Sequence, residues 1–226
     1  MARKAAKRTS AKGSKAKSTA SSRRRGGARS KAPRDPRARV LKAALDLAAT
    51  DGWGSVDMAD IAAAAGMAPD DVQAVFASKA AIVAGFFGDV DDAILAGGEP
   101  DAGDTARDRL FDVLMRSFDA LQPHKSAVAS ILGHLACRPV AAISASPRFI
   151  CSMAGMVEAA GLSARGPCGA LRTKGLALIY ANALRAWLRD NSADMAATMA
   201  ALDKGLRQAE RAASLCQRLG PASVAA

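Results

Sequence analysis

The chain has 226 residues, of which 50% are hydrophobic and 4% aromatic, with a formal net charge of +11. Ala, Leu and other good helix formers dominate, so we predict an all-α fold. No window holds about 18 uninterrupted apolar residues, and no apolar segment follows the charged N-terminus. We therefore expect no integral membrane segment and no secretory signal.

Nothing in the sequence indicates an enzyme. The four cysteines are Cys137, Cys151, Cys168 and Cys216. None forms a CxxC pair, and neither of the two histidines stands at metal-ligand spacing from them. Nucleophile elbows, phosphate-binding loops and dinucleotide fingerprints are also missing from the sequence. We predict a non-enzymatic cytoplasmic protein without metal or cofactor, with reduced cysteines packed between helices.

The positive charge is concentrated at the N-terminus. Residues 1–39 contain 15 Lys and Arg and a single acid, Asp35, whereas residues 40–226 carry a net charge of −3. The low-complexity Lys/Arg/Ala/Ser composition of residues 1–36 buries too little apolar surface to offset its ordering entropy, so we predict a disordered arm. Such an arm would bind nucleic-acid phosphates without sequence preference. A solubilising extension without a partner is the alternative.

Residues 37–96 have the pattern of a small helical domain. An apolar face at helical spacing starts at Val40, and Gly52 suits the left-handed position after the first helix. Asp57 predicts the N-cap of a second helix that reaches Ala65.

A tight turn and two more helices are expected next. Gly66 supplies the turn, and Pro69 suits the first position of a short helix that ends near Phe76. Ser78 predicts the cap of a fourth helix to about Ala96. We expect residues 97–219 to form a second domain, a bundle whose five predicted helices lie near 104–121, 124–137, 147–160, 167–189 and 192–219. The total is about nine helices.

This order of elements resembles the TetR family of bacterial regulators. The segments that carry the resemblance are "VLKAALDLAATDGW", "MADIAAAAGM" and "FASKAAIVAGFF". The residues that match the family's motif at its spacing are Gly52-Trp53, Asp60-Ile61-Ala62, Gly66, Phe76 and Lys79. The resemblance covers about residues 37–96. It implies a helix-turn-helix domain, a C-terminal ligand-binding and dimerisation domain, and a homodimer that binds DNA.

The third helix departs from the family's pattern. It begins with Pro69, Asp70 and Asp71 where the family has a basic start, and residues 40–96 carry a net charge of −7. These carboxylates stabilise their own helix by roughly 0.3–1 kcal/mol each but repel phosphate. By resemblance, the expected DNA contacts are Arg34, Arg37, Arg39, Gln73 and Lys79.

The second half offers candidates for a ligand pocket and for a dimer interface. The pocket is expected to be apolar and to hold a small apolar or lipid-like ligand. Its candidate lining residues are Phe111, Met115, Phe118, Leu135, Met153, Ile179 and Tyr180. By resemblance, the last two helices pair with a second subunit, and the candidate interface residues are Leu184, Trp187, Leu188, Met195, Met199, Leu202 and Leu206.

A second resemblance is looser. The segments "DGW", "LQPH" and "YANALRAWLRDNS" are similar to the lipid-binding accessory family of ubiquinone biosynthesis, which has a TetR-like fold and does not read DNA. This resemblance implies a non-enzymatic lipid-binding protein. In that case the positive charge of the basic arm would suit an anionic membrane surface instead of DNA.

Overall fold

The computed structural model describes residues 35–98, 101, 103–136 and 147–219, and all regular structure in these residues is helical. The predicted all-α fold is confirmed. The chain from Pro33 onward forms one compact unit, and the division between residues 96 and 97 stays a prediction. Residues 1–34, which include most of the predicted arm and Arg34, lie outside the described residues.

The N-terminal helices begin and end at the predicted signals. The elements are α1 (Pro36–Leu47), the π-helical turn η1 (Ala48–Gly52), α2 (Met58–Ala65) and α3 (Pro69–Val75). The side chain of Asp35 accepts a hydrogen bond from the Arg37 amide at 3.0 Å and caps α1. Gly52, which ends η1, has a φ of 86°, a left-handed conformation that costs glycine little.

The helix-turn-helix is built from α2 and α3. Asp57 and Asp60 form a capping box at the start of α2, in which each carboxylate accepts a backbone N–H of the other residue. These hydrogen bonds lower the pKa of Asp57. Gly66 ends α2 with a φ of 60°, and Pro69 opens α3 as predicted.

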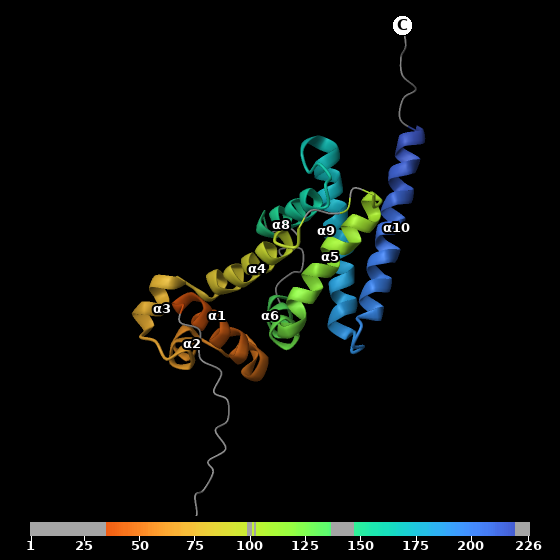
Figure 1. The fold of residues 1–226 in the computed structure, drawn as a ribbon. Coiled ribbons are helices and arrows are strands. Elements are labelled where there is room, and N and C mark those ends of the chain that lie inside the picture. The colour runs from red at the N-terminus through yellow and green to blue at the C-terminus, as the bar shows by residue number, and fades with distance from the viewer. Residues whose placement is uncertain (1–34, 99–100, 102, 137–146, 220–226) are drawn as a thin grey trace, which may run out of the picture. The chain divides into compact units, whose positions relative to one another are not determined.

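The remaining helices follow in the predicted order. They are α4 (Lys79–Leu95), α5 (Ala106–Leu121), the short 3₁₀ turn η2 (Gln122–His124), α6 (Lys125–Ala136), α8 (Pro147–Ala159), α9 (Gly166–Arg189) and α10 (Ala196–Leu219). Helix α4 packs against α1, α5 and α8, and α6 packs against η1. Helices α9 and α10 lie side by side (Figure 1).

The start of α10 differs from the predicted range of 192–219, although the Ser192 hydroxyl accepts a hydrogen bond from the Ala196 amide at 3.0 Å. The carboxylate of Asp190 accepts hydrogen bonds from the Ser192 hydroxyl and amide and from the Thr198 amide and hydroxyl. These bonds hold the pKa of Asp190 well below its ordinary value. They also shape residues 190–195 into a connection, so that α10 begins at Ala196.

An aromatic cluster forms the core of the C-terminal helices. Phe118 stacks on Tyr180 with ring centroids 5.2 Å apart and packs against Trp187 at 5.9 Å. The Trp187 indole N–H donates to Gln122 Oε1 at 2.7 Å, which satisfies its one polar group.

Two features bear on the earlier expectations about cysteines and membranes. Cys151 and Cys168 are exposed, so the prediction that they pack between helices is wrong. The side chains of Cys137 and Cys216 lie outside the described residues.

No single described helix is long and apolar enough to cross a membrane; only the pair α3 and α4, bent by 51°, meets that length and composition together.

Candidate nucleic-acid interface and ligand cavity

The exposed face of α3 is acidic. Val72 is buried and anchors the helix, whereas Asp70, Asp71 and Gln73 are exposed. Gln73 therefore has the accessibility that a base contact requires, and the amide of Gln has the chemistry to read adenine. The two carboxylates beside it would repel the phosphates that flank any such base.

The predicted DNA contact Arg37 is engaged within the fold. Its guanidinium binds Asp89 on α4 through two hydrogen bonds of 2.9 and 2.6 Å and also donates to the Gly85 carbonyl. It lies over the ring of Phe76, 5.8 Å from the centroid. The hydrogen bond to Asp89 raises the pKa of Arg37. This arginine joins α1 to α4.

Arg39 and Lys79 have acceptors of their own. Arg39 donates to the carbonyls of Ala65 and Gly66 at 2.5 and 2.9 Å and thereby caps the end of α2. Lys79 Nζ donates to the Trp53 carbonyl at 2.7 Å and to the Val56 carbonyl, and it lies 4.6 Å from the Trp53 ring centroid.

Every Lys and Arg between residues 35 and 98 therefore has an acceptor inside the described chain, since the fourth, Lys42, pairs with Asp46 at 2.5 Å. The other Lys and Arg residues that precede the helix-turn-helix belong to residues 1–34, which lie outside the described part of the chain. The sequence predicted these side chains as phosphate contacts because it shows charge and position, whereas their partners come from helices distant in the chain.

The junction between the helix-turn-helix and the later helices is centred on Trp53, which is 5% exposed. Its backbone N–H donates to the Ser130 hydroxyl of α6 at 2.8 Å. Nearby, the ring of His124 packs edge-on against Phe86 of α4, with centroids 5.5 Å apart, and burial lowers the pKa of His124. The N-terminal helices are thus tied to both α4 and α6.

An apolar cavity of about 410 Å³ lies between α4, α5, α6, α8 and α9. Its size falls within the roughly 300–1,000 Å³ of typical small-molecule sites. Three of the predicted lining residues, Leu135, Met153 and Tyr180, border it. Phe118 lies behind Tyr180, fully buried, and does not line the cavity.

The other predicted lining residues lie elsewhere. Phe111, Met115 and Ile179 are half-buried, pack against the core, and do not border the cavity. The predicted lining did not include α4, whose cavity-lining residues are Ala80, Val83, Ala84, Phe87, Val90 and Asp91. In the sequence, these apolar residues recur at helical spacing next to the core residues of α4, and this pattern indicates a second apolar stripe on the helix.

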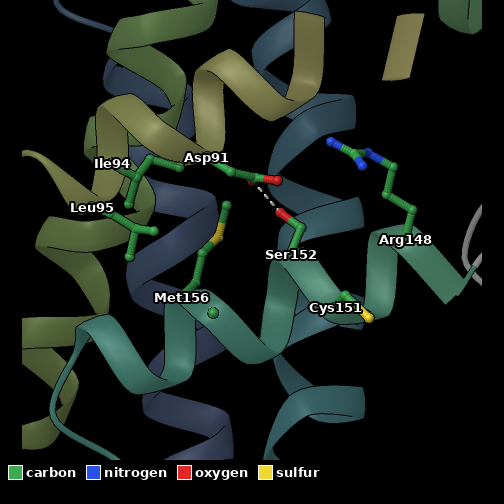
Figure 2. Close-up of a pocket in the computed structure, with 8 residues that line it drawn as sticks. Asp91, Ile94, Leu95, Arg148, Cys151, Ser152 and Met156 are labelled. Carbon is green, nitrogen blue, oxygen red and sulfur yellow. Dashed lines mark hydrogen bonds between the residues drawn. The ribbon is translucent and has the colours of Figure 1, made fainter. Parts of the chain in front are cut away.

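The mouth of the cavity carries its charged groups. Asp91 on α4 accepts a hydrogen bond from the Ser152 hydroxyl on α8 at 2.5 Å. Arg148 stands one turn before Ser152 on α8, and Figure 2 shows these three residues facing the space between the two helices. The same three line both the cavity and a smaller outer hollow that also contacts Cys151.

The predicted dimer residues are mostly internal. Trp187 and Leu202 are 0% exposed, Leu206 is 3% and Met195 is 8%, so these four belong to the intrachain core and offer no surface to a second subunit. Leu184 lines the cavity. The remaining two candidates, Leu188 and Met199, are half-buried.

Other residues of α9 are exposed instead. Leu171 and Leu178 are 71% and 72% exposed and stand two turns apart on one face of the helix. This pair was not among the predicted interface residues, because both faces of α9 carry apolar residues at helical spacing.

The fold and the turn between α2 and α3 define a helix-turn-helix protein with a C-terminal helical part that encloses an apolar cavity. Residues 40–85 match the family of bacterial regulatory proteins described as the tetR family. The predicted resemblance to the TetR family is thereby confirmed for the helix-turn-helix.

Solved structures of low sequence identity share this fold. A TetR transcriptional regulator from Nitrosomonas europaea ATCC 19718 has a TM-score of 0.64 and 22% identity, with 78% of this chain and 99% of that chain covered. A TetR transcriptional regulator from Rhodococcus sp. RHA1 has a TM-score of 0.57 and 18% identity over 76% of this chain and 94% of that one. Comparison with curated proteins gives no match. The family that residues 40–85 match is the regulator family and not the lipid-binding accessory family.

Proposed function

We propose that the protein is a DNA-binding transcriptional regulator that acts as a homodimer and responds to a small apolar ligand. The observation that carries this proposal is the match of residues 40–85 to the TetR family on a helix-turn-helix that has the capping box of α2 and the Gly66 turn. The cavity between α4 and the later helices supports the ligand response.

The source of duplex affinity is divided between two parts of the chain. Gln73 of the helix-turn-helix is exposed, but the Lys and Arg side chains of this part of the chain all bind acceptors within the chain. The N-terminal arm, rich in Lys and Arg, provides counterion release and thus most of the affinity. A basic arm that precedes a helix-turn-helix also has the length and charge to enter the minor groove.

The ligand response runs through α4. This helix lines the cavity with six residues and also binds the N-terminal helices through Asp89 and Lys79. Because Lys79 holds the carbonyls of Trp53 and Val56 just before α2, a shift of α4 on ligand binding moves the start of the helix-turn-helix. A ligand with different affinities for the two positions of α4 would shift the population between them.

The dimer interface includes the exposed face of α9. Leu171 and Leu178 supply the apolar contacts, and the buried residues of α9 and α10 hold the two helices together beneath that face.

The first experiment measures duplex affinity across a salt series for the full chain and for a chain that starts at Pro33. This start keeps the Asp35 cap and the ion pair between Arg37 and Asp89. The duplex is one selected by the full chain from a randomised pool, and a scrambled duplex is the reference. The full chain should show the steeper salt dependence. Equal slopes for the two chains would refute the role of the arm.

A second experiment tests whether α3 faces the duplex. The double variant Asp70→Lys with Asp71→Gly should bind the selected duplex roughly ten-fold more tightly, with a steeper salt slope, because it removes repulsion and adds a phosphate contact. The matched control is Asp119→Lys with Asp104→Gly, which changes the net charge equally at exposed positions outside the helix-turn-helix. An equal gain in both double variants would show that α3 does not face DNA.

A further inference from the structure

The polar groups of the cavity are confined to one end. Among its described lining residues, Asp91, Arg148 and Ser152 all border the outer hollow as well, whereas the rest of the wall is aliphatic, aromatic or Met, apart from the Tyr180 hydroxyl. That hydroxyl lies 3.4 Å from Ser117 Oγ and has a partner within the core. A ligand therefore enters with its apolar body inward and its polar head at the mouth.

The mouth carries both signs of charge without an ion pair between them. One oxygen of the Asp91 carboxylate accepts the Ser152 hydroxyl. The Arg148 guanidinium lies over Gly88, one turn before Asp91 on α4, where a Cβ would come within 2.8 Å of it. Among the described residues, no carboxylate comes within 4.0 Å of Arg148. The mouth thus offers separate hydrogen-bond donors and acceptors to a ligand.

This arrangement discriminates between head groups. A carboxylate head would bind Arg148 but would be repelled by the like charge of Asp91 at the same rim. An ammonium head would bind Asp91 but would be repelled by Arg148. An uncharged head that both accepts and donates, such as a primary amide, satisfies both residues without a repulsive contact.

We propose that the cavity binds an uncharged amphipathic ligand, whose apolar body fills the chamber and whose head accepts a hydrogen bond from Arg148 and donates one to Asp91. This inference rests on the proposed ligand response and specifies the class of ligand. The apolar wall selects the body, and the pair of opposite charges selects the head.

The test compares three probes with one chain length and different heads: octanamide, octanoate and octylammonium. Calorimetric titration of the full-length wild-type chain should give the tightest binding for octanamide, by roughly ten-fold, the size expected for one buried polar group left without a partner. Tightest binding of either ion, or no binding of any probe, would overturn the proposal.

Two variants make the test specific to the mouth. Asp91→Asn keeps an acceptor for Ser152 and removes the negative charge, so octanoate should gain affinity relative to octanamide. Arg148→Met removes the positive charge at similar length, so octylammonium should gain. The control variants Asp119→Asn and Arg211→Met alter exposed groups that do not line the cavity and should leave the order of affinities unchanged. If the three probes keep the same order of affinity in the wild type and in all four variants, Asp91 and Arg148 do not bind the head of the ligand.

A second readout locates the bound probe. Cys151 is exposed at the outer hollow, whereas Cys168 is exposed on α9 away from it. Octanamide should slow alkylation of Cys151, measured by peptide mass spectrometry, and leave Cys168 as the internal reference. Equal rates at both cysteines with and without octanamide would place the probe elsewhere. Duplex binding of the same samples separates the two proposals, since a regulator that binds DNA but fails these tests loses only the ligand class.

Discussion

Individual polar residues in this protein act mainly as connectors between helices. Lys79, Arg37 and Arg39 each bind carbonyls or a carboxylate on another element, and Asp190 orders the connection before α10. Net attraction in such bonds is modest, about 0.5–1.5 kcal/mol for a typical one, but leaving a buried carbonyl without a donor costs more. Replacement of Arg37, Arg39 or Lys79 is therefore expected mainly to destabilise the helix-turn-helix, and any loss of DNA affinity would follow from that destabilisation.

Tyr180 provides a test of burial at the residue scale, because it is the only tyrosine in the chain. Burial raises the pKa of Tyr180 to about 12. The folded state favours the neutral phenol of Tyr180. The stability that this buried phenol contributes is complete below the ordinary tyrosine pKa of about 10, and it is lost as the pH rises from 10 through 12. Absorbance at tyrosinate wavelengths should show no ionisation near pH 10 in the folded protein.

Unfolding by guanidinium should restore the ordinary titration of Tyr180. The Tyr180→Phe variant supplies the absorbance baseline and should remove this part of the alkaline loss of stability. Ionisation of the folded wild type near pH 10, with unchanged helix content by circular dichroism, would contradict the buried position of the phenol.

Local signals in the sequence were sufficient to place most helix ends. Asp57, Gly66, Pro69 and Ser78 lie where caps and turns require them, because each acts on backbone groups within a few residues. The roles of the cations could not be predicted in the same way. The acceptor of Arg37 is 52 residues away in the sequence, and only the fold brings the two together.

At the scale of elements, α4 combines two apolar stripes. Ile82, Phe86 and Ile94 are buried in the core, whereas the neighbouring stripe lines the cavity, and the buried Val90 belongs to both. The helical period identifies apolar faces but does not distinguish a face that packs from one that borders a space. This is why the predicted pocket contained residues of α5 and α9 and omitted α4.

Helix α9 contains a glycine whose role is steric. A Cβ on Gly169 would lie 2.1 Å from the Ala164 carbonyl carbon, which is backbone and does not move aside as a flexible side chain does. Gly169→Ala should therefore destabilise the protein by about 1–3 kcal/mol, although alanine favours helix in general. Urea unfolding measures the change in the free energy of unfolding.

The matched control is Gly133→Ala in α6, where nothing lies within 4 Å of the added Cβ. This variant should be stabilised by about 0.5–1 kcal/mol through helix propensity alone. Opposite signs for the two substitutions would support the close approach of residues 164 and 169, and stabilisation by both would argue against it.

At the scale of the whole molecule, the exposed pair Leu171 and Leu178 on α9 is the site that we propose for contact with a second copy. Leu178→Glu should raise the dimer dissociation constant by roughly ten- to one-hundred-fold, because a two-fold axis places the lost apolar contact in the interface twice. Sedimentation equilibrium measures this constant. Leu95→Glu changes a leucine that is 59% exposed on α4 and should leave the dimer intact.

A dimer constant unaffected by Leu178→Glu would move the interface away from this face of α9. The sequence alone favoured Trp187 and Leu202 for the interface because they stand on strongly apolar stripes. Their complete burial shows that those stripes were already occupied by packing between α9, α10 and α5. Which of two apolar stripes remains exposed depends on how the helices are arranged, and that arrangement is not a local property of the sequence.

The junction at Trp53 has a practical consequence for optical measurements. The chain has two tryptophans: Trp53 lies where α4 and α6 meet the helix-turn-helix, and Trp187 lies in the C-terminal aromatic cluster. Replacing one with Phe leaves the fluorescence of the other as a reporter of its own region. Coincident emission changes during denaturation would identify a single cooperative unit, whereas an earlier change at Trp53 would identify the helix-turn-helix as the less stable unit.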